Sequence, residues 1–265
     1  MKESAAALRP SLARGRWIFL RGLARQAGHW GAFPDIFRKA LPGVEVLQPD
    51  LPGCGCATTT VCPTTVPEIL EALRAEVGLR HPAADPGRPV AVLGLSLGGM
   101  LVVEWMARYP GELAGAVLVN TSLRGLSPPW RRLRVRGLWH LAGAALASTA
   151  AAREAHVYKM VSCRPDLAVR IVADWVALGD IPRGTAWRQL RAAARYQPRA
   201  LPRPEAMLVL ASTSDGMVDP SCSRAVAAAM GAELREHPTA GHDLILDEPE
   251  WAAAAIAGWI AERGL

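Results

Sequence analysis

The segment Val90-Ala91-Val92-Leu93-Gly94-Leu95-Ser96-Leu97-Gly98-Gly99-Met100 decides how the rest of the chain is interpreted. An apolar run leads into a Gly-x-Ser-x-Gly turn, and an apolar helical pattern follows it. This order predicts a buried strand, a sharp turn with Ser96 at its tip and a helix, which together form a nucleophile elbow. Glycines at 94 and 98 leave room where side chains would clash. The helix N-terminus beyond Ser96 offers free N–H groups that suit a developing negative charge.

Composition limits the class of protein. The chain has 265 residues, and 51% of them are hydrophobic, which is enough for one large α/β domain. The formal net charge is +6, but no stretch resembles a nucleic-acid-binding module, so we expect no nucleic-acid partner. Five cysteines without a disulfide-like framework favour a reducing compartment. Cys54-x-Cys56 followed by Cys62 does not match zinc-ligand spacing, so we expect no metal site.

Two stretches bear on location. Residues 1–10 include an acidic residue and no apolar run, which is unlike a signal peptide. The longest uncharged stretch, residues 137–152, is too short and too polar to span a bilayer. We therefore expect a soluble, cytoplasmic protein without a membrane span.

Strand and helix patterns alternate along most of the chain. Short apolar runs predict strands at residues 17–20, 44–47, 90–93, 116–120, 207–211 and 233–235. Helical spacing lies between them, for example after Thr65, which is placed to cap a helix. This alternation predicts an α/β fold with a doubly wound, mostly parallel sheet of about six strands.

The alternation is interrupted once. Residues 123–200 carry helical patterns and no strand. We interpret this segment as a helical lid, and residues 1–122 and 201–265 as the core that it covers. Ligands of such sheets bind at the carboxyl edge of the strands. We therefore expect the lid to determine which substrate shapes fit.

A serine hydroxyl is a weak nucleophile that needs a base, and the base needs an acid to orient it. Asp215 lies four residues past the strand at 207–211, and His242 follows a glycine, in the chain order that this fold requires. Asp219 and Asp243 compete with Asp215 for the role of the acid. Asn120, at the end of a strand, is interpreted as a hydrogen-bonding residue.

Several motifs make the chain resemble the α/β-hydrolase superfamily over about residues 16–122 and 203–265. Leu20-Arg21-Gly22-Leu23 resembles its His-Gly oxyanion loop, and Asp50-Leu51-Pro52-Gly53 resembles its Asp-x-Pro-Gly turn. Asp215-Gly216-Met217-Val218 resembles its acid-bearing turn, and Gly241-His242 resembles its terminal Gly-His. The resemblance implies a triad of Ser96, Asp215 and His242, with oxyanion donors at the backbone N–H groups of Leu23 and Leu97.

The sequence departs from that family pattern in two places. Arg21 stands where many members have a histidine, which changes the polarity expected near the oxyanion hole. Only about fifteen residues precede the first strand, so the early antiparallel hairpin of full-size members is expected to be missing or reduced. Serine at the nucleophile position argues against haloalkane dehalogenase and epoxide hydrolase chemistry.

Other residues have two interpretations each. His29 and Trp30 either anchor a packed loop or line the substrate pocket together with Arg21. The basic run at residues 131–136 is either a solvated helix face or an entrance that binds the anionic part of a coenzyme A-linked or carrier-linked acyl group.

The resemblance implies a serine hydrolase that cleaves a carboxylic ester or thioester through an acyl-enzyme on Ser96. Its substrate would be a small acyl compound, and no metal or organic cofactor would be needed. One alternative is a C–C bond hydrolase or non-hydrolytic lyase that uses the same triad. Another is a ligand-binding or sensor protein that retains the triad.

Overall fold

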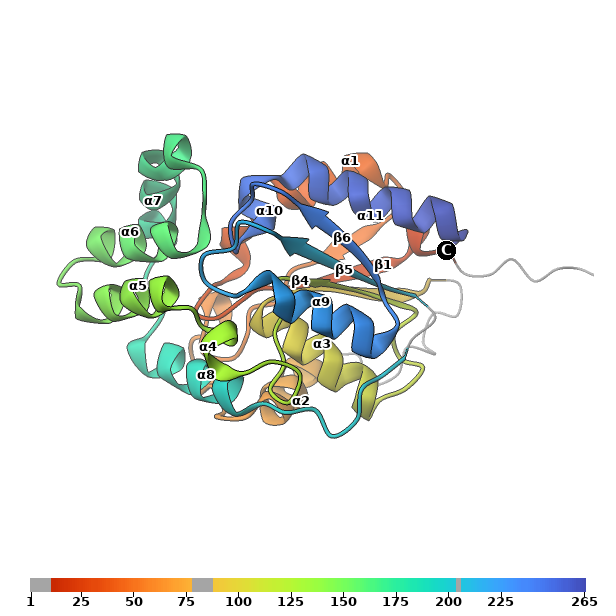
Figure 1. Ribbon diagram of the computed structural model, residues 1–265, viewed down its shortest axis with the longest axis horizontal. Coiled ribbons are helices and arrows are strands. Elements are labelled where there is room, and N and C mark those ends of the chain that lie inside the picture. The colour runs from red at the N-terminus through yellow and green to blue at the C-terminus, as the bar shows by residue number, and fades with distance from the viewer. Residues whose placement is uncertain (1–10, 78–87, 204–205) are drawn as a thin grey trace, which may run out of the picture.

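The structure, a computed structural model, describes residues 11–77, 88–203 and 206–265. Its centre is one six-stranded sheet in the order β2-β1-β3-β4-β5-β6, in which every pair is parallel (Figure 1). The strands are β1 (Arg16–Leu20), β2 (Glu45–Leu47), β3 (Val90–Leu95), β4 (Gly115–Val119), β5 (Met207–Ser212) and β6 (Glu233–His237). The predicted sheet is confirmed. Residues 1–10, where we expect no signal peptide, lie outside the described ranges.

The central strands β3, β4 and β5 are almost entirely apolar, as expected where helices cover both faces of a sheet. Every residue of β3, β4 and β5 is buried. The edge strand β6 is half-exposed instead, and three of its five residues are charged. Charged side chains on an edge strand discourage pairing with another chain.

Two layers of helices cover the sheet (Figure 1). One face carries α1 (Phe33–Ala40) and α11 (Pro249–Arg263), which contact each other. The other face carries α2 (Val66–Glu76), α3 (Leu97–Arg108) and α9 (Pro220–Met230). Short elements join the main ones: η1 (Leu12–Arg14), η2 (Ala27–Trp30), η3 (Gly55–Ala57), η5 (Pro165–Leu167) and α10 (Leu244–Asp247).

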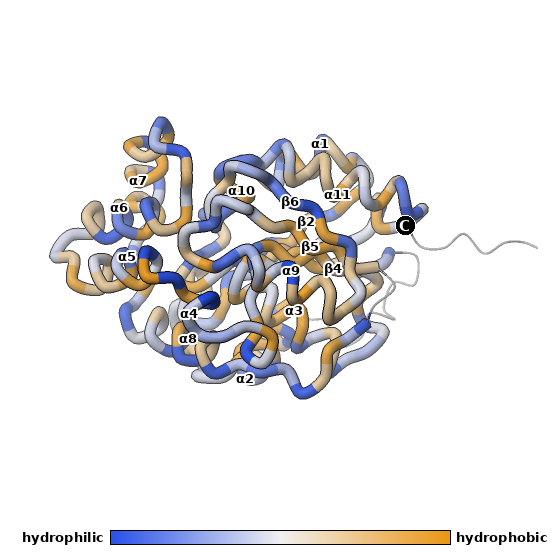
Figure 2. The backbone as a smooth tube through the Cα atoms, in the orientation of Figure 1, coloured by the Kyte–Doolittle hydropathy of each residue, from blue (hydrophilic) through white to orange (hydrophobic). Residues whose placement is uncertain are grey.

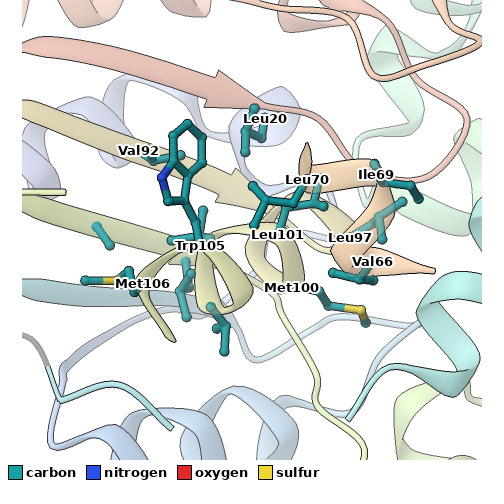
Figure 3. Packing of buried hydrophobic residues seen from close by; sticks show 14 of the residues in the cluster. Leu20, Val66, Ile69, Leu70, Val92, Leu97, Met100, Leu101, Trp105 and Met106 are labelled. Carbon is teal, nitrogen blue, oxygen red and sulfur yellow. The ribbon is translucent and has the colours of Figure 1, made fainter. Parts of the chain in front are cut away.

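The packing of α2 against α3 supports the turn that carries Ser96. Leu70 of α2 belongs to the same buried cluster as Leu101 and Trp105 of α3, and all three side chains are at most 1% exposed (Figure 3). Full burial of each such side chain contributes about 2 kcal/mol. The predicted cap of α2 is present, since the Thr65 hydroxyl accepts a hydrogen bond from the Glu68 N–H at 3.4 Å.

Five helices lie between β4 and β5, all within the segment expected to be strand-free. They are α4 (Pro129–Arg132), α5 (Val135–Leu146), α6 (Ala150–Val161), α7 (Ala168–Ala177) and α8 (Arg183–Arg195). Figure 1 shows α5, α6 and α7 standing beyond the sheet, at the end opposite the chain's C-terminus. The hydropathy colouring separates the apolar strands of the centre from this more mixed helical segment (Figure 2). None of the helices in the described ranges is long and apolar enough to cross a membrane.

The first turn of α3 lies directly against the backbone of β1. A Cβ atom on Gly98 would lie 2.2 Å from the carbonyl oxygen of Leu20, which is backbone and cannot move aside. A Cβ on Gly94 would lie 2.5 Å from the Gly98 carbonyl carbon. The two glycines predicted to give clearance therefore do so against backbone atoms.

We expect Gly98→Ala to lower the free energy of unfolding by about 3 kcal/mol, because the added methyl forces α3 away from β1. Chemical denaturation measures this difference. Gly184→Ala is the control, since a Cβ at Gly184 meets nothing within 4 Å and its φ is ordinary. It should leave stability unchanged or raise it slightly. Equal stability of the Gly98→Ala variant and the original protein would contradict the steric argument.

Candidate active site

Ser96 forms the tip of a sharp turn between β3 and α3. Its backbone has φ 54° and ψ −109°, a conformation that residues other than glycine rarely adopt. The turn is held on both sides: the Ser96 N–H donates to the Val119 carbonyl oxygen at 2.9 Å, and the Ser96 carbonyl oxygen accepts from the Gly99 N–H at 3.0 Å. The surrounding packing thus maintains a strained turn that presents the hydroxyl at the carboxyl edge of the sheet.

Asp215 lies in the loop after β5 and faces His242. One carboxylate oxygen, Oδ1, accepts hydrogen bonds from the N–H groups of Met217 and Val218 at 2.8 and 2.9 Å. The other, Oδ2, accepts from Nδ1 of His242 at 2.7 Å. Asp215 and His242 are 1% and 2% exposed. Both carboxylate oxygens are therefore committed, and the imidazole is oriented with Nε2 away from the acid.

The His242 loop is held by two buried side chains from other elements. Asn120, at the end of β4, donates from Nδ2 to the His242 carbonyl oxygen at 2.8 Å and accepts at Oδ1 from the Ser212 N–H at 2.9 Å. Asp247 of α10 accepts from the Gly241 N–H at 2.8 Å. Asn120 thus ties the loops after β4, β5 and β6 together, as its interpretation as a hydrogen-bonding residue predicted.

Charge neighbours control the protonation of His242. Burial alone would lower the pKa of His242, but the Asp215 carboxylate and its hydrogen bond raise that pKa above its ordinary value. Asp243 raises it further, and Arg21 lowers it. The buried imidazole is therefore a stronger base than a free histidine.

The remaining nitrogen of His242 is buried beside a small cavity. Nε2 has no hydrogen-bond partner among the described residues. His242 and Ser96 both line a cavity of about 60 Å³, which has room for a few waters or a short acyl group. Nε2 is the atom that a serine proton would reach in a Ser-His-Asp arrangement. The structure thus brings together the three residues that the sequence nominated.

The expected oxyanion donors flank Ser96. The N–H of Leu97 opens the first turn of α3, and Leu23 follows β1. Within the described part of the chain, neither N–H donates to a carbonyl or side-chain oxygen. Two free donors beside the serine can stabilise a tetrahedral oxyanion.

The two competing aspartates have other partners. Asp219 caps α9, where its side chain accepts from the Ser221 N–H at 2.9 Å, and this bonding lowers the pKa of Asp219. Asp243 pairs with Arg21. Geometry therefore favours Asp215 over both.

A wide groove leads from Ser96 to the surface. Its volume is about 990 Å³, and it runs between α4 and α5 on one side and α8 on the other. Apolar side chains from all of these elements line it, among them Met100, Leu126, Trp130, Leu138, Leu190 and Met217. Ser96 thus stands between a small inner cavity and a large apolar groove.

No metal site is evident in the described ranges, where no group of three His, Cys, Asp or Glu side chains could hold an ion. The cysteines are free thiols. Burial raises the pKa of Cys54 to about 12 and that of Cys62 to about 11, so neither is a thiolate at neutral pH.

A family model described as the alpha/beta hydrolase family matches residues 17–255. The chain belongs to the alpha/beta hydrolase family. No curated protein matches its sequence.

Solved structures share the alpha/beta hydrolase fold with this chain at low sequence identity. A hydrolase from Pseudomonas aeruginosa PA01 is 22% identical, with 94% of this chain and 91% of that chain covered and a TM-score of 0.69. An esterase from Thermogutta terrifontis is 20% identical, with coverage of 95% and 91% and a TM-score of 0.68. A lipase-esterase related protein from Clostridium acetobutylicum ATCC 824 is 13% identical, with coverage of 94% and 96% and a TM-score of 0.70.

In this alpha/beta hydrolase, Arg21 connects the loop after β1 to the His242 loop. Its guanidinium pairs with the Asp243 carboxylate through both terminal nitrogens, and each side chain is 3% exposed. The guanidinium also lies over the Trp30 ring, 4.6 Å from its centroid. Arg21 and Asp243 both line the small cavity. Arg21, which departs from the family pattern, therefore lies at the cavity, and the Asp243 carboxylate neutralises its charge.

The structure places neither His29 nor Trp30 among the residues that line the cavities around Ser96. Trp30 packs against Phe19 in the core, 5.2 Å between ring centroids. His29 accepts from Arg25 at 2.7 Å. Burial and the positive charge of Arg25 lower the pKa of His29 to about 2, so its ring stays neutral. Of the three pocket candidates, only Arg21 lies at the cavity, and the other two anchor a packed loop.

Arg25 is a residue that sequence reasoning missed. Its guanidinium donates to Glu154 of α6 at 2.7 Å and stacks on Trp175 of α7, 4.5 Å from the ring centroid. Arg25 also lines the small cavity. In the sequence, only the position of Arg25 near the oxyanion motif could have drawn attention to it, because its partner Glu154 lies 129 positions away.

We expect Asp215→Asn to lower kcat by about 10⁴-fold, because the amide cannot hold the imidazole in the tautomer that the reaction needs. Asp219→Asn should leave kcat nearly unchanged, since asparagine also caps helices. Steady-state kinetics with a p-nitrophenyl ester measures both. A large loss of kcat in Asp219→Asn alone would identify Asp219 as the acid that orients His242.

The ion pair beside His242 should set the pH profile of kcat/KM. His242 must be neutral to accept a proton, so activity rises with pH through its pKa. Asp243→Asn removes a charge that raises the pKa of His242, so the rise should move to lower pH. Arg21→Gln removes a charge that lowers this pKa, so the rise should move to higher pH.

The double variant Arg21→Gln/Asp243→Asn should return the profile towards its original position. It should also be more stable than either single variant, because each of those leaves one buried charge unpaired. Movement of the profile in the same direction in both single variants would contradict this electrostatic account.

Proposed function

We propose that the protein is a serine hydrolase that cleaves a carboxylic ester or thioester through an acyl-enzyme on Ser96. One observation carries the proposal: the buried Asp215–His242 pair leaves Nε2 unbonded in a cavity that Ser96 also lines. A histidine oriented in this way can accept the serine proton. A protein that used the same pocket only for binding would have no need of a buried imidazole whose pKa a carboxylate raises.

In the proposed mechanism, Nε2 of His242 takes the hydroxyl proton as Ser96 Oγ attacks the carbonyl carbon. Asp215 stabilises the imidazolium that forms, and the N–H groups of Leu23 and Leu97 stabilise the oxyanion. Each such donor is worth about 3 kcal/mol in measured cases. His242 then protonates the leaving group, and water activated by His242 releases the acid. Side chains and backbone groups supply every step, so no cofactor is required.

The groove supports a substrate with a substantial apolar part. A polar substrate would leave the apolar lining of the groove exposed to water, whereas each buried CH₂ group contributes about 0.8 kcal/mol. The small cavity, which Ser96 also lines, suits a short group. The esterase and the lipase-esterase related protein among the similar structures agree with ester chemistry.

A fluorophosphonate probe should label the native protein at Ser96, because the probe requires an activated serine. Mass spectrometry of the labelled peptide identifies the site. Ser96→Ala should abolish labelling. Ser122→Ala is the matched control, since Ser122 also lines the groove but has no histidine beside it, and should be labelled fully at Ser96. A folded protein that resists the probe would favour the binding or sensor alternative.

A further inference from the structure

The outer face of α5 is apolar and exposed. Val135, Leu138, Trp139 and Leu146 are 85%, 55%, 73% and 86% exposed. Their spacing puts them on one side of the helix, whereas Gly137 and Ala144, on the opposite side, are buried. Trp130 of α4 is 72% exposed beside them. Soluble proteins rarely present so many large apolar side chains together unless the surface binds something.

Positive charges predominate around this face, although Asp219 lines a surface pocket together with Trp130 and Val135. Residues 121–152 contain no aspartate or glutamate, and neither do residues 181–204 on the α8 side. Both segments are rich in arginine: Arg124, Arg131, Arg132, Arg134 and Arg136 in the first, and Arg183, Arg188, Arg191 and Arg195 within α8. In the described part of the chain, none of these arginines forms a salt bridge, although many arginines elsewhere do.

The apolar face is continuous with the groove. Trp130, Val135 and Leu138 belong to both the exposed surface and the groove lining, and Ser96 lies at the inner end of the groove. On the opposite wall, Trp187 is 66% exposed on the same face of α8 as the groove-lining Leu190. A molecule held at this surface would therefore find an apolar path to the serine.

We propose that the outer face of α5, with Trp130, docks on the surface of a bilayer that contains anionic phospholipid. An amphipathic helix of this kind lies in the plane of the interface, with its apolar side among the acyl chains and its basic residues at the phosphates. A second copy of the chain fits less well, since both copies would bring arginine-rich surfaces together. The groove then admits an apolar ester from the bilayer to Ser96, and this second step rests on the proposed hydrolase function.

Co-sedimentation with vesicles tests the docking without turnover, using full-length Ser96→Ala protein. Vesicles of phosphatidylcholine with phosphatidylglycerol should bind it, and vesicles of phosphatidylcholine alone should bind it at least tenfold more weakly. Arg188→Gln/Arg191→Gln should weaken binding about fivefold per arginine. High salt should have the same effect as these substitutions. Binding that ignores both lipid charge and salt, or no binding at all, overturns the proposal.

Trp139→Ser/Leu146→Ser removes the apolar anchor without touching the groove lining, and should reduce binding at least tenfold. Val169→Ser is the matched control and should bind normally. Val169 is 87% exposed on α7, which packs against α6, the helix that also covers the inner side of α5. Analytical sedimentation without vesicles provides a further check. If the Ser96→Ala protein is a dimer and adding Trp139→Ser/Leu146→Ser makes it a monomer, the face binds a second copy and the proposal is overturned.

Turnover separates the docking from the chemistry. With wild-type Ser96, Trp139→Ser/Leu146→Ser should lose activity on a lipid ester embedded in the vesicles and keep its rate on soluble p-nitrophenyl acetate. Normal vesicle binding with no turnover and no fluorophosphonate labelling would remove the hydrolase function and leave the docking intact. Equal loss of activity on both substrates would show that the substitutions disturb the structure of the site. It would overturn the proposed entry of bilayer esters through the groove.

Discussion

The site depends on how closely the first turn of α3 approaches β1. Because the Leu20 carbonyl oxygen occupies the space of a Gly98 side chain, the helix can begin immediately beside the strand. This contact fixes the direction in which α3 leaves Ser96 and forces the serine into a positive φ. It also brings the Leu97 N–H near the loop that follows β1. Ser96 and the free N–H group of Leu97 are thus positioned by backbone packing, with the apolar core of α2 and α3 behind them.

The His242 side of the site is assembled by different means. Its loops meet through polar side chains, Asn120 and Asp247, whose amide and carboxylate groups bind backbone atoms. Buried polar groups of this kind hold one geometry because every alternative leaves a donor or acceptor unsatisfied. Close packing positions the serine, and hydrogen bonding positions the base. The two halves share the small cavity and the pair of Arg21 with Asp243.

The sequence predicted the features that local pattern controls. The run Val90–Leu95 with its glycines predicted the strand, the turn and the helix, and the chain order nominated Asp215 and His242 before their 2.7 Å contact was known. It could not predict the pair of Arg21 with Asp243, since 222 positions separate the two and neither lies in a pattern that names its partner. The same reason left His29 ambiguous. Its packed position depends on contacts with Arg25 and with Trp175 of α7, from a segment whose helical spacing indicates helices but not where they dock.

The loop that follows β1 has a consequence for how a substrate enters. The Ala24 N–H donates to Gln189 of α8, Arg25 pairs with Glu154 of α6, and Gln26 donates to the Leu178 carbonyl oxygen just after α7. Three helices are therefore tied to the loop that carries Leu23, the proposed oxyanion donor. If these helices moved outward to admit a substrate, they would displace Leu23 from its position beside Ser96. These contacts favour entry with the helices in place, so the dimensions of the groove limit which molecules reach Ser96.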